Sequence, residues 1–236
     1  MKLILFDVDG TLVDSQHMIH AAMSQAYRDH GLACPQAAQV RSTIGLSLQE
    51  AFRQLSAGTE HPIDGLTASY RKAFSALREA GEVASPLFPG ARETIMRLMR
   101  RPDLALGIAT GKSRRGIAVM LEQYDLKGAF VTIQTADSSP SKPHPGMVLE
   151  AMRASGIAAA STAVVGDTVF DMQMAQAAGA VGIGVAWGYH PVAELHAAGA
   201  RAVVDDFRAL ESMLDRLWSP ASPGNAAPKG EAASNA

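Results

Sequence analysis

Cysteine, aromatic residues and an excess of positive charge are all scarce in this chain. Cys34 is the one cysteine among 236 residues, so neither an internal disulfide nor a cysteine-based zinc site is available. Aromatic residues make up 6%, and the formal net charge is -2. Binding to a nucleic-acid backbone depends largely on an excess of lysine and arginine, and we therefore expect no nucleic-acid partner.

Long hydrophobic runs are absent as well. The apolar start of the chain is interrupted at Asp7 and Asp9, too early for the core of a secretion signal. No uncharged apolar stretch approaches the ~20 residues of a membrane-spanning helix. We expect a cytoplasmic protein without a membrane partner, and a reducing compartment suits a chain with a single cysteine.

Hydrophobic residues are plentiful, at 47%, and they form short runs separated by helical patterns. These runs lack the polar alternation of a half-exposed strand, as expected for a parallel sheet covered on both faces. We predict an α/β protein with a doubly wound, Rossmann-like parallel sheet. The expected strands span 3–6, 104–109, 130–133, 162–165, 181–185 and 202–204, and the expected helices 92–100, 117–121, 147–154, 172–178 and 210–217.

One interval breaks this alternation. Residues 14–86 contain no convincing strand, and helical patterns cover 18–30, 48–55 and 66–80. We predict an α/β core formed by 1–13 and 87–218, with 14–86 as an inserted α-helical domain. Basic and acidic side chains balance within the insert, which predicts no basic face. Residues 219–236 are rich in Ala, Pro, Gly and Ser, and we predict a disordered tail.

A pair of acids directly follows the first apolar run. Asp7 and Asp9 stand at the carboxyl end of the expected strand, where open parallel sheets bind their ligands. Two carboxylates this close repel each other unless a cation or a proton holds them. The alternative is an ordinary Asp/Gly turn after a strand.

A second pair, Asp167 and Asp171, follows the run 162–165. An Asp near a helix start is also a good N-terminal cap. Capping explains one of these acids, but not four acids gathered from two strands. Hard oxygen ligands at this density are those that Mg²⁺ prefers.

Two further segments suit a phosphate group. Thr110 and Gly111 end one strand and precede a helix, where a hydroxyl and free N–H groups form an anion site. Lys142 stands in a loop before a helix and would offset the charge of carboxylates and phosphate. Taken singly, each has an ordinary alternative: a helix cap for Thr110 and a solvated side chain for Lys142.

The order acid pair, hydroxyl, lysine, acid pair resembles the motifs of the haloacid dehalogenase-like hydrolase superfamily. The resemblance covers about residues 3–217, and it is strongest to phosphoglycolate phosphatase-like members with a small α-helical cap. The inserted helical domain, 14–86, corresponds to that cap.

The resemblance implies a role for each motif. Asp7 would be the nucleophile that becomes an aspartyl phosphate. Asp9 would be the general acid and base, with its backbone carbonyl on Mg²⁺. Thr110 and the Gly111 N–H would bind the phosphate, and Lys142 would steady the charge of the nucleophile and the phosphate.

The metal would be held at the second acid pair as well as at the first. The resemblance implies that Asp167 ligates Mg²⁺ directly and that Asp171 either ligates it or orients its waters. Mg²⁺ would screen Asp7 from the incoming anion and stabilise the transferring group. Gly111 departs from close relatives, which often have Asn there. Dehalogenases lack the acid at the position of Asp9, so dehalogenation is not expected.

The substrate would then be a small phosphate ester, selected by the cap. The loop 41–47 resembles the cap loop that reaches into the pocket, with Gly45 permitting a sharp turn and Arg41 meeting a substrate carboxylate. The alternative for Arg41 is a solvated helix residue. Residues 187–191 follow a strand and either border the pocket or form a structural loop.

Two other functions stay open. A phosphomutase of the β-phosphoglucomutase type places an Arg soon after a Gly-x-Ser in the cap loop, whereas Leu48 follows Ser47 here. A non-catalytic binding protein on the same fold would be indicated by loss of Asp7 or Asp9, and both are present. We expect a monomer or a homodimer.

Overall fold

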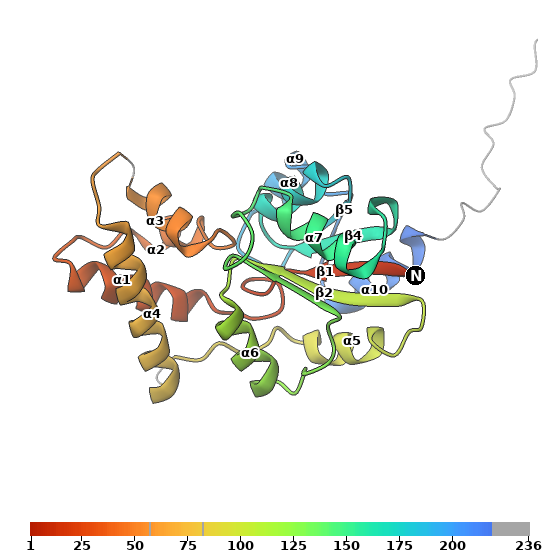
Figure 1. Ribbon diagram of the computed structural model, residues 1–236, viewed down its shortest axis with the longest axis horizontal. Coiled ribbons are helices and arrows are strands. Elements are labelled where there is room, and N and C mark those ends of the chain that lie inside the picture. Colours follow the sequence, from red (N-terminus) through yellow and green to blue (C-terminus); the bar gives the residue numbers. More distant parts are fainter. Residues whose placement is uncertain (57, 82, 219–236) are drawn as a thin grey trace, which may run out of the picture.

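The computed structural model describes residues 1–56, 58–81 and 83–218, so the predicted tail, 219–236, lies outside the described residues. In Figure 1 the sheet and its flanking helices lie on the right, and the helical insert lies on the left. The described strands form one sheet of six, in the order β3-β2-β1-β4-β5-β6, with every pairing parallel. They are β1 Lys2–Phe6, β2 Leu104–Thr110, β3 Thr132–Thr135, β4 Thr162–Gly166, β5 Val181–Val185 and β6 Ala202–Val204.

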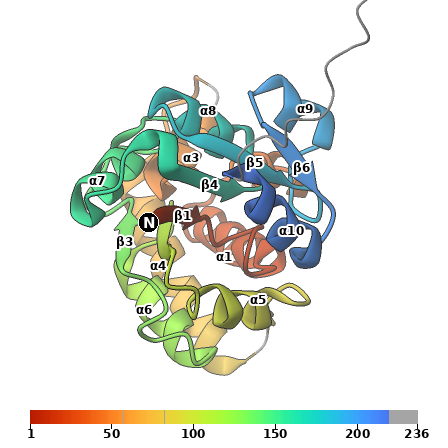
Figure 2. The same cartoon turned by 90° about the vertical axis from the view of Figure 1, so that its right-hand side faces the viewer.

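The predicted α/β class is confirmed, because helices cover both faces of this sheet. Ile4 and Phe6 of β1 pack with α5 (Ala91–Leu98), α6 (Arg114–Gln123) and α10 (Phe207–Leu217). Leu3 and Leu5 point to the other face, towards α7 (Gly146–Ser155) and α8 (Val169–Ala177). Figure 2 shows these two layers on opposite sides of the sheet. Burial on both faces explains why the strands read as unbroken apolar runs.

Several elements differ from the sequence prediction, and α6 and α8 each begin three residues before the predicted start. The third strand begins at Thr132, two residues later than expected. Two short helices have no predicted counterpart: α2, Ala37–Arg41, and α9, Val192–Ala197. Each is too short to show a helical repeat of apolar residues, and only Val40 and Leu195 are buried in them.

The insert between β1 and β2 is helical, as predicted. Its helices are α1 Gln16–Asp29, α2, α3 Leu48–Ser56 and α4 Ile63–Ala80, and they enclose a separate apolar core around Tyr27 and Phe52. The chain enters and leaves the insert at adjacent points: Asp14 N donates to Pro86 O at 2.8 Å, and Val13 bridges Leu87. The two ends of the insert therefore lie side by side, and the domain boundaries at 14 and 86 stay a prediction.

The order of the strands positions the site. From β1 the chain goes to β2 on one side, whereas β4 lies on the other side, so the carboxyl ends of β1 and β4 are neighbours. A crevice outside such a reversal is where open α/β sheets bind ligands. Among the described residues, no helix is both long and apolar enough to cross a bilayer.

Candidate active site

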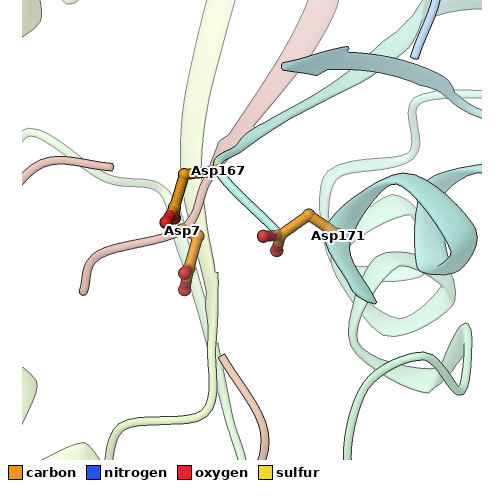
Figure 3. A group of neighbouring side chains, drawn as sticks. All are labelled: Asp7, Asp167 and Asp171. Carbon is orange, nitrogen blue, oxygen red and sulfur yellow. The ribbon is translucent and has the colours of Figure 1, made fainter. Parts of the chain in front are cut away.

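Three buried acids meet at the carboxyl ends of β1 and β4. One carboxylate oxygen each from Asp7, Asp167 and Asp171 lies within 4.8 Å of the others, and all three residues have no exposed surface. Figure 3 shows Asp7 and Asp167 at the strand ends and Asp171 reaching towards them from the first turn of α8. The structure therefore brings Asp7 together with two acids that lie 160 or more residues after it in the sequence.

Lys142 lies beside this acidic cluster. Its Nζ is 2.9 Å from Asp7 Oδ1 and donates to Asp171 Oδ1 at 2.6 Å. The lysine is 1% exposed, so it is not the solvated side chain of the simpler interpretation. Burial favours the neutral amine, but the carboxylates of Asp171 and Asp7 outweigh that effect and raise the pKa of Lys142.

Burial disfavours the ionised form of two of these acids. Burial raises the pKa of Asp7 to about 6, although Lys142 opposes the shift. Burial also raises the pKa of Asp167 well above its usual range, and Asp171 and Asp7 add to this shift. Ionisation of all three acids therefore destabilises the folded protein, and a bound cation would offset this destabilisation.

The donor set fits Mg²⁺. The one lysine neutralises only one of three carboxylates, and Asp7 Oδ2 is buried with no hydrogen-bond partner among the described residues. Asp171 is more fully engaged, since its Oδ2 accepts from Thr168 N and Oγ1 in a capping box at the start of α8. The capping and cluster interpretations of Asp171 thus hold together. Carboxylate oxygens without His or Cys are ligands for a hard divalent cation.

A glycine makes room for the cluster. Gly10 has φ +93°, and a Cβ atom there would lie 2.2 Å from Asp167 Oδ2. A side chain at this position would therefore collide with the carboxylate. Thr11 Oγ1 and Tyr189 N donate to the two Asp167 oxygens, at 2.9 Å each, and hold the carboxylate in place.

Asp9 lies apart from these three acids and has its own partners. Ser15 Oγ donates to Asp9 Oδ1 at 2.7 Å, and Lys112 Nζ lies 2.8 and 3.1 Å from the two Asp9 oxygens. Lys112 also lies over the Phe74 ring of α4, at 5.1 Å. Ser15 and Lys112 were not predicted as site residues from the sequence. Their only signal was proximity to the motifs at Asp9 and Thr110.

Thr110 and Gly111 lie at the end of β2, opposite the insert. The Thr110 hydroxyl is buried and accepts from Lys112 N at 3.3 Å. A Cβ atom on Gly111 would lie 2.3 Å from Leu46 O and 2.8 Å from Gly45 O. The insert loop therefore lies directly on Gly111, which gives a physical reason for glycine here rather than the Asn often found in close relatives.

A cavity of about 840 Å³ lies between the core and the insert. Its lining includes Asp7, Asp9, Thr110 and Gly111 from the core and Gly45 from the insert. The predicted specificity residue Gly45 is therefore at the cavity, whereas Arg41 is exposed and lines a separate pocket of about 160 Å³ with His17 and His20. The position of Arg41 thus agrees with the alternative interpretation of a solvated helix residue.

The predicted absence of a basic face on the insert is wrong. Four basic residues of the insert line the cavity: Arg53, Arg71, Lys72 and Arg78. The charges of the insert balance in number but not in position. Counting residues along the segment could not show which of them share a surface.

The loop after β5 ties the insert to the acidic cluster. Tyr189 Oη accepts from Ser15 N at 2.9 Å and donates to Asp14 Oδ1 at 3.2 Å, while Tyr189 N binds Asp167. Trp187 packs against Phe207 with ring centroids 4.6 Å apart. Residues 187–191 therefore form a structural loop that holds Asp167 in place and does not line the cavity. Among the described residues, Tyr189 joins Asp167 to the point where the insert begins.

Comparison with known proteins agrees with this geometry. A family model described as haloacid dehalogenase-like hydrolase matches residues 4–185. A protein named "Probable phosphatase IndB" from Dickeya dadantii (strain 3937) is 37% identical over 229 residues, covering 93% of this chain and 98% of that protein. A phosphoglycolate phosphatase from Pseudomonas putida (strain KT2440) is 31% identical over 214 residues, covering 89% of this chain and 78% of that protein.

The solved structures give the same result. A hydrolase from Pseudomonas syringae superposes with a TM-score of 0.81 and 28% sequence identity, covering 93% of this chain and all of that one. Its likeness extends over the insert as well as the core, because so much of both chains is covered. The chain therefore belongs to the haloacid dehalogenase-like hydrolases, and its homologues place it among their phosphatases, the phosphoric monoester hydrolases.

Proposed function

We propose that this protein is a Mg²⁺-dependent phosphatase that hydrolyses a small phosphorylated metabolite, similar to phosphoglycolate, through an aspartyl phosphate on Asp7. The observation that carries the proposal is the unpaired Asp7 Oδ2, buried beside Lys142 and two further carboxylates at a cavity wall. A carboxylate oxygen held in place without a hydrogen bond is available to attack phosphorus.

Asp7 and Asp9 would share the reaction between them. Asp7 attacks phosphorus while the ester bond breaks, and Asp9 donates a proton to the leaving oxygen. Asp9 then takes a proton from water, which attacks the aspartyl phosphate and releases inorganic phosphate and free Asp7. Lys112 and Ser15 orient the Asp9 carboxylate between these steps.

The phosphoryl oxygens would be bound by the Thr110 hydroxyl, the Gly111 N–H and Lys142. Lys142 is already fixed by Asp171, so it costs little entropy to hold it at the developing charge. Asp7, Asp167 and Asp171 would hold Mg²⁺, with the Asp9 carbonyl as a further ligand. The bound ion would supply Lewis-acid stabilisation of the transferring group.

Two rival functions are less well supported. A phosphomutase needs a group that binds the non-transferred part of its substrate at the loop after Ser47, and Leu48 there is apolar. A non-catalytic binding protein has no need of a buried carboxylate with one oxygen left without a partner beside a buried lysine, because such a group destabilises the fold. We propose a cytoplasmic monomer or homodimer.

The experiment is a panel of phosphorylated metabolites, phosphoglycolate included, assayed for inorganic phosphate with Mg²⁺ present. Release of free phosphate at a rate that scales with enzyme supports the proposal. Transfer of the phosphoryl group to a second hydroxyl, without free phosphate, would identify a mutase. No turnover of any ester, with binding retained, would identify a binding protein.

A further inference from the structure

The cavity is far larger than the phosphoryl site needs. Its 840 Å³ lies in the range of pockets that enclose drug-sized ligands, and a two-carbon ester such as phosphoglycolate would occupy a small part of it. Besides the acids and Thr110, the lining includes Phe74 of α4 and Arg115 of α6. These two helices lie near each other in Figures 1 and 2, one from the insert and one from the core.

Four further basic side chains line this cavity. We call Arg71, Lys72, Arg78 and Arg115 the basic rim. Arg71, Lys72 and Arg115 are exposed, and Arg78 is partly buried. Arg71 and Arg78 are seven residues apart on α4, so they share one helix face over about 10 Å.

The rim lacks counter-charges of its own. In the part of the chain that the structure describes, Arg71, Lys72 and Arg115 make no ion pair, and Arg78 has only Glu79 at 3.8 Å. The other cations of the lining are engaged: Lys112 with Asp9 and Arg53 with Glu50.

No acid of the lining forms an ion pair with the rim in the described residues. Asp7 and Asp9 are paired with Lys142 and Lys112, and Glu50 is paired with Arg53. Asp137 accepts from the Arg114 backbone N at 2.7 Å. Like charges gathered at one opening repel one another, and an anion entering there relieves that repulsion.

We propose that the substrate carries a second anionic group, at the end remote from the phosphoryl group, and that the basic rim receives it. The inference rests on the proposed phosphatase function and refines its substrate class. Guanidinium groups bind carboxylate or phosphate oxygens in pairs, so a terminal carboxylate and a terminal phosphate both satisfy this chemistry. We expect this second group on a substrate longer than phosphoglycolate, because the cavity is large and three of the four rim residues are exposed, whereas Asp7 and Thr110 are buried.

The test compares two series of phosphate monoesters of equal length. One series is O-phosphorylated ω-hydroxy acids of two to eight carbons, and the other is alkanediol monophosphates, which end in a neutral hydroxyl. α,ω-Alkanediol bisphosphates form a third arm that separates a terminal phosphate from a terminal carboxylate. The enzymes are wild type, Arg71→Ala, Arg115→Ala and the double variant, each assayed with Mg²⁺ for kcat/KM.

We expect wild-type kcat/KM for one of the anionic series to exceed the matched diol monophosphate by at least ten-fold, with the maximum at a chain longer than two carbons. The double variant should reduce that ratio at least ten-fold, while kcat/KM for the diol monophosphates stays within about three-fold. Arg28→Ala is the matched control, because this exposed insert arginine binds Gln25 and is outside the cavity lining. Arg71→Lys should keep part of the ratio.

Three results would overturn the inference. The ratio of kcat/KM for the anionic esters to kcat/KM for the matched diol monophosphates could stay near one at every chain length. It could instead be highest at two carbons and remain unchanged in the double variant. Alternatively, both series could lose kcat/KM equally in the variants, which would show that the rim only attracts anions over a distance. Each result leaves hydrolysis of the diol monophosphates by the wild-type enzyme intact, so the phosphatase proposal would stand. Absence of hydrolysis in every arm would instead contradict the phosphatase itself.

Discussion

The Leu46 carbonyl oxygen occupies the place where a side chain on Gly111 would begin, since a Cβ atom there would lie 2.3 Å from it. One residue belongs to the loop of the insert and the other to the turn of the core that we propose binds phosphate. Ser47 N, next to Leu46, also donates to Ser141 Oγ at 2.8 Å, immediately before Lys142. The insert therefore contacts both of the segments that we propose bind phosphate.

Gly111→Ala should lift this loop from the core. We expect kcat/KM for small phosphate esters to fall about ten-fold, equivalent to about 1.4 kcal/mol of transition-state stabilisation. The melting temperature should change by only a few degrees, because the contact joins two domains that have separate cores. Steady-state kinetics and thermal unfolding check both expectations. An unchanged kcat/KM would mean that the working enzyme does not need this contact.

Asp7→Asn should abolish turnover while the fold persists. The amide is nearly isosteric but cannot form the aspartyl phosphate, so kcat should fall more than about 100-fold. Circular dichroism should match the wild type, since Lys142 keeps Asp171 as a partner. Asp64→Asn, at an exposed carboxylate of α4 outside the cavity lining, is the control and should retain full activity. Residual turnover of more than a few per cent would rule out covalent catalysis by Asp7.

Removal of metal should have effects on both activity and stability. EDTA should abolish hydrolysis, Mg²⁺ should restore it, and Zn²⁺ should substitute poorly because the cluster lacks His and Cys. Mg²⁺ at 100 times its Kd should stabilise the metal-free protein by about 2.7 kcal/mol, seen as a rise in melting temperature. Asp167→Asn should remove most of that rise. Full activity in metal-free buffer would reject the site.

The buried acids make the stability of the metal-free protein depend on pH. Burial raises the pKa of Asp7 to about 6 in the folded state, against an ordinary value of 3.8. The folded protein therefore binds this proton more tightly than the unfolded chain does. Stability should fall as pH rises from about 4 to about 6, by up to about 3 kcal/mol from this group. Asp167, whose pKa is also raised, acts in the same direction.

Urea unfolding in EDTA between pH 4 and 7.5 measures this slope. In Asp7→Asn the slope should become shallower, because one of the groups responsible is gone. Saturating Mg²⁺ should flatten it in the wild type, since the ion favours the ionised carboxylates. A free energy of unfolding that rises over this interval would contradict the assignment.

Arg41→Ala should leave catalysis unchanged. Arg41 is exposed and lines the small pocket with His17 and His20, outside the lining of the large cavity. We expect kcat/KM for carboxylate-bearing and neutral phosphate esters to stay within about two-fold of the wild type. A selective loss on the carboxylate-bearing ester would return Arg41 to the substrate site.

The acid pairs were predictable because the sheet is parallel. Apolar runs locate the strands, parallel strands present their carboxyl ends at one edge, and Asp7 and Asp167 each follow a run directly. Local patterns therefore identified the cluster without any knowledge of loop geometry. Lys142 came from a motif in a loop, and its burial could be learned only from the structure.

The partners of Asp9 and the basic rim were not predictable in the same way. Lys112 reaches Asp9 across 103 residues, and the side-chain path is set by how the turn after β2 packs against α4. Arg71 and Arg78 do repeat at helical spacing, which was a usable signal for a shared face. The direction in which that face points depends on how the insert packs against the core. The periodicity within α4 does not encode this packing.

The hydrogen bond between Asp14 and Pro86 has a consequence for how such enzymes diversify. The two ends of the helical insert are joined to each other by this hydrogen bond, so we expect that a change in the helices between them would leave the register of β1 and β2 intact. Insertions at a closed junction of this kind cost little in loop entropy. Substitutions in the helical part would therefore change which metabolite fits the cavity. The buried carboxylates of the core, which we propose act on the phosphate ester, would keep their positions.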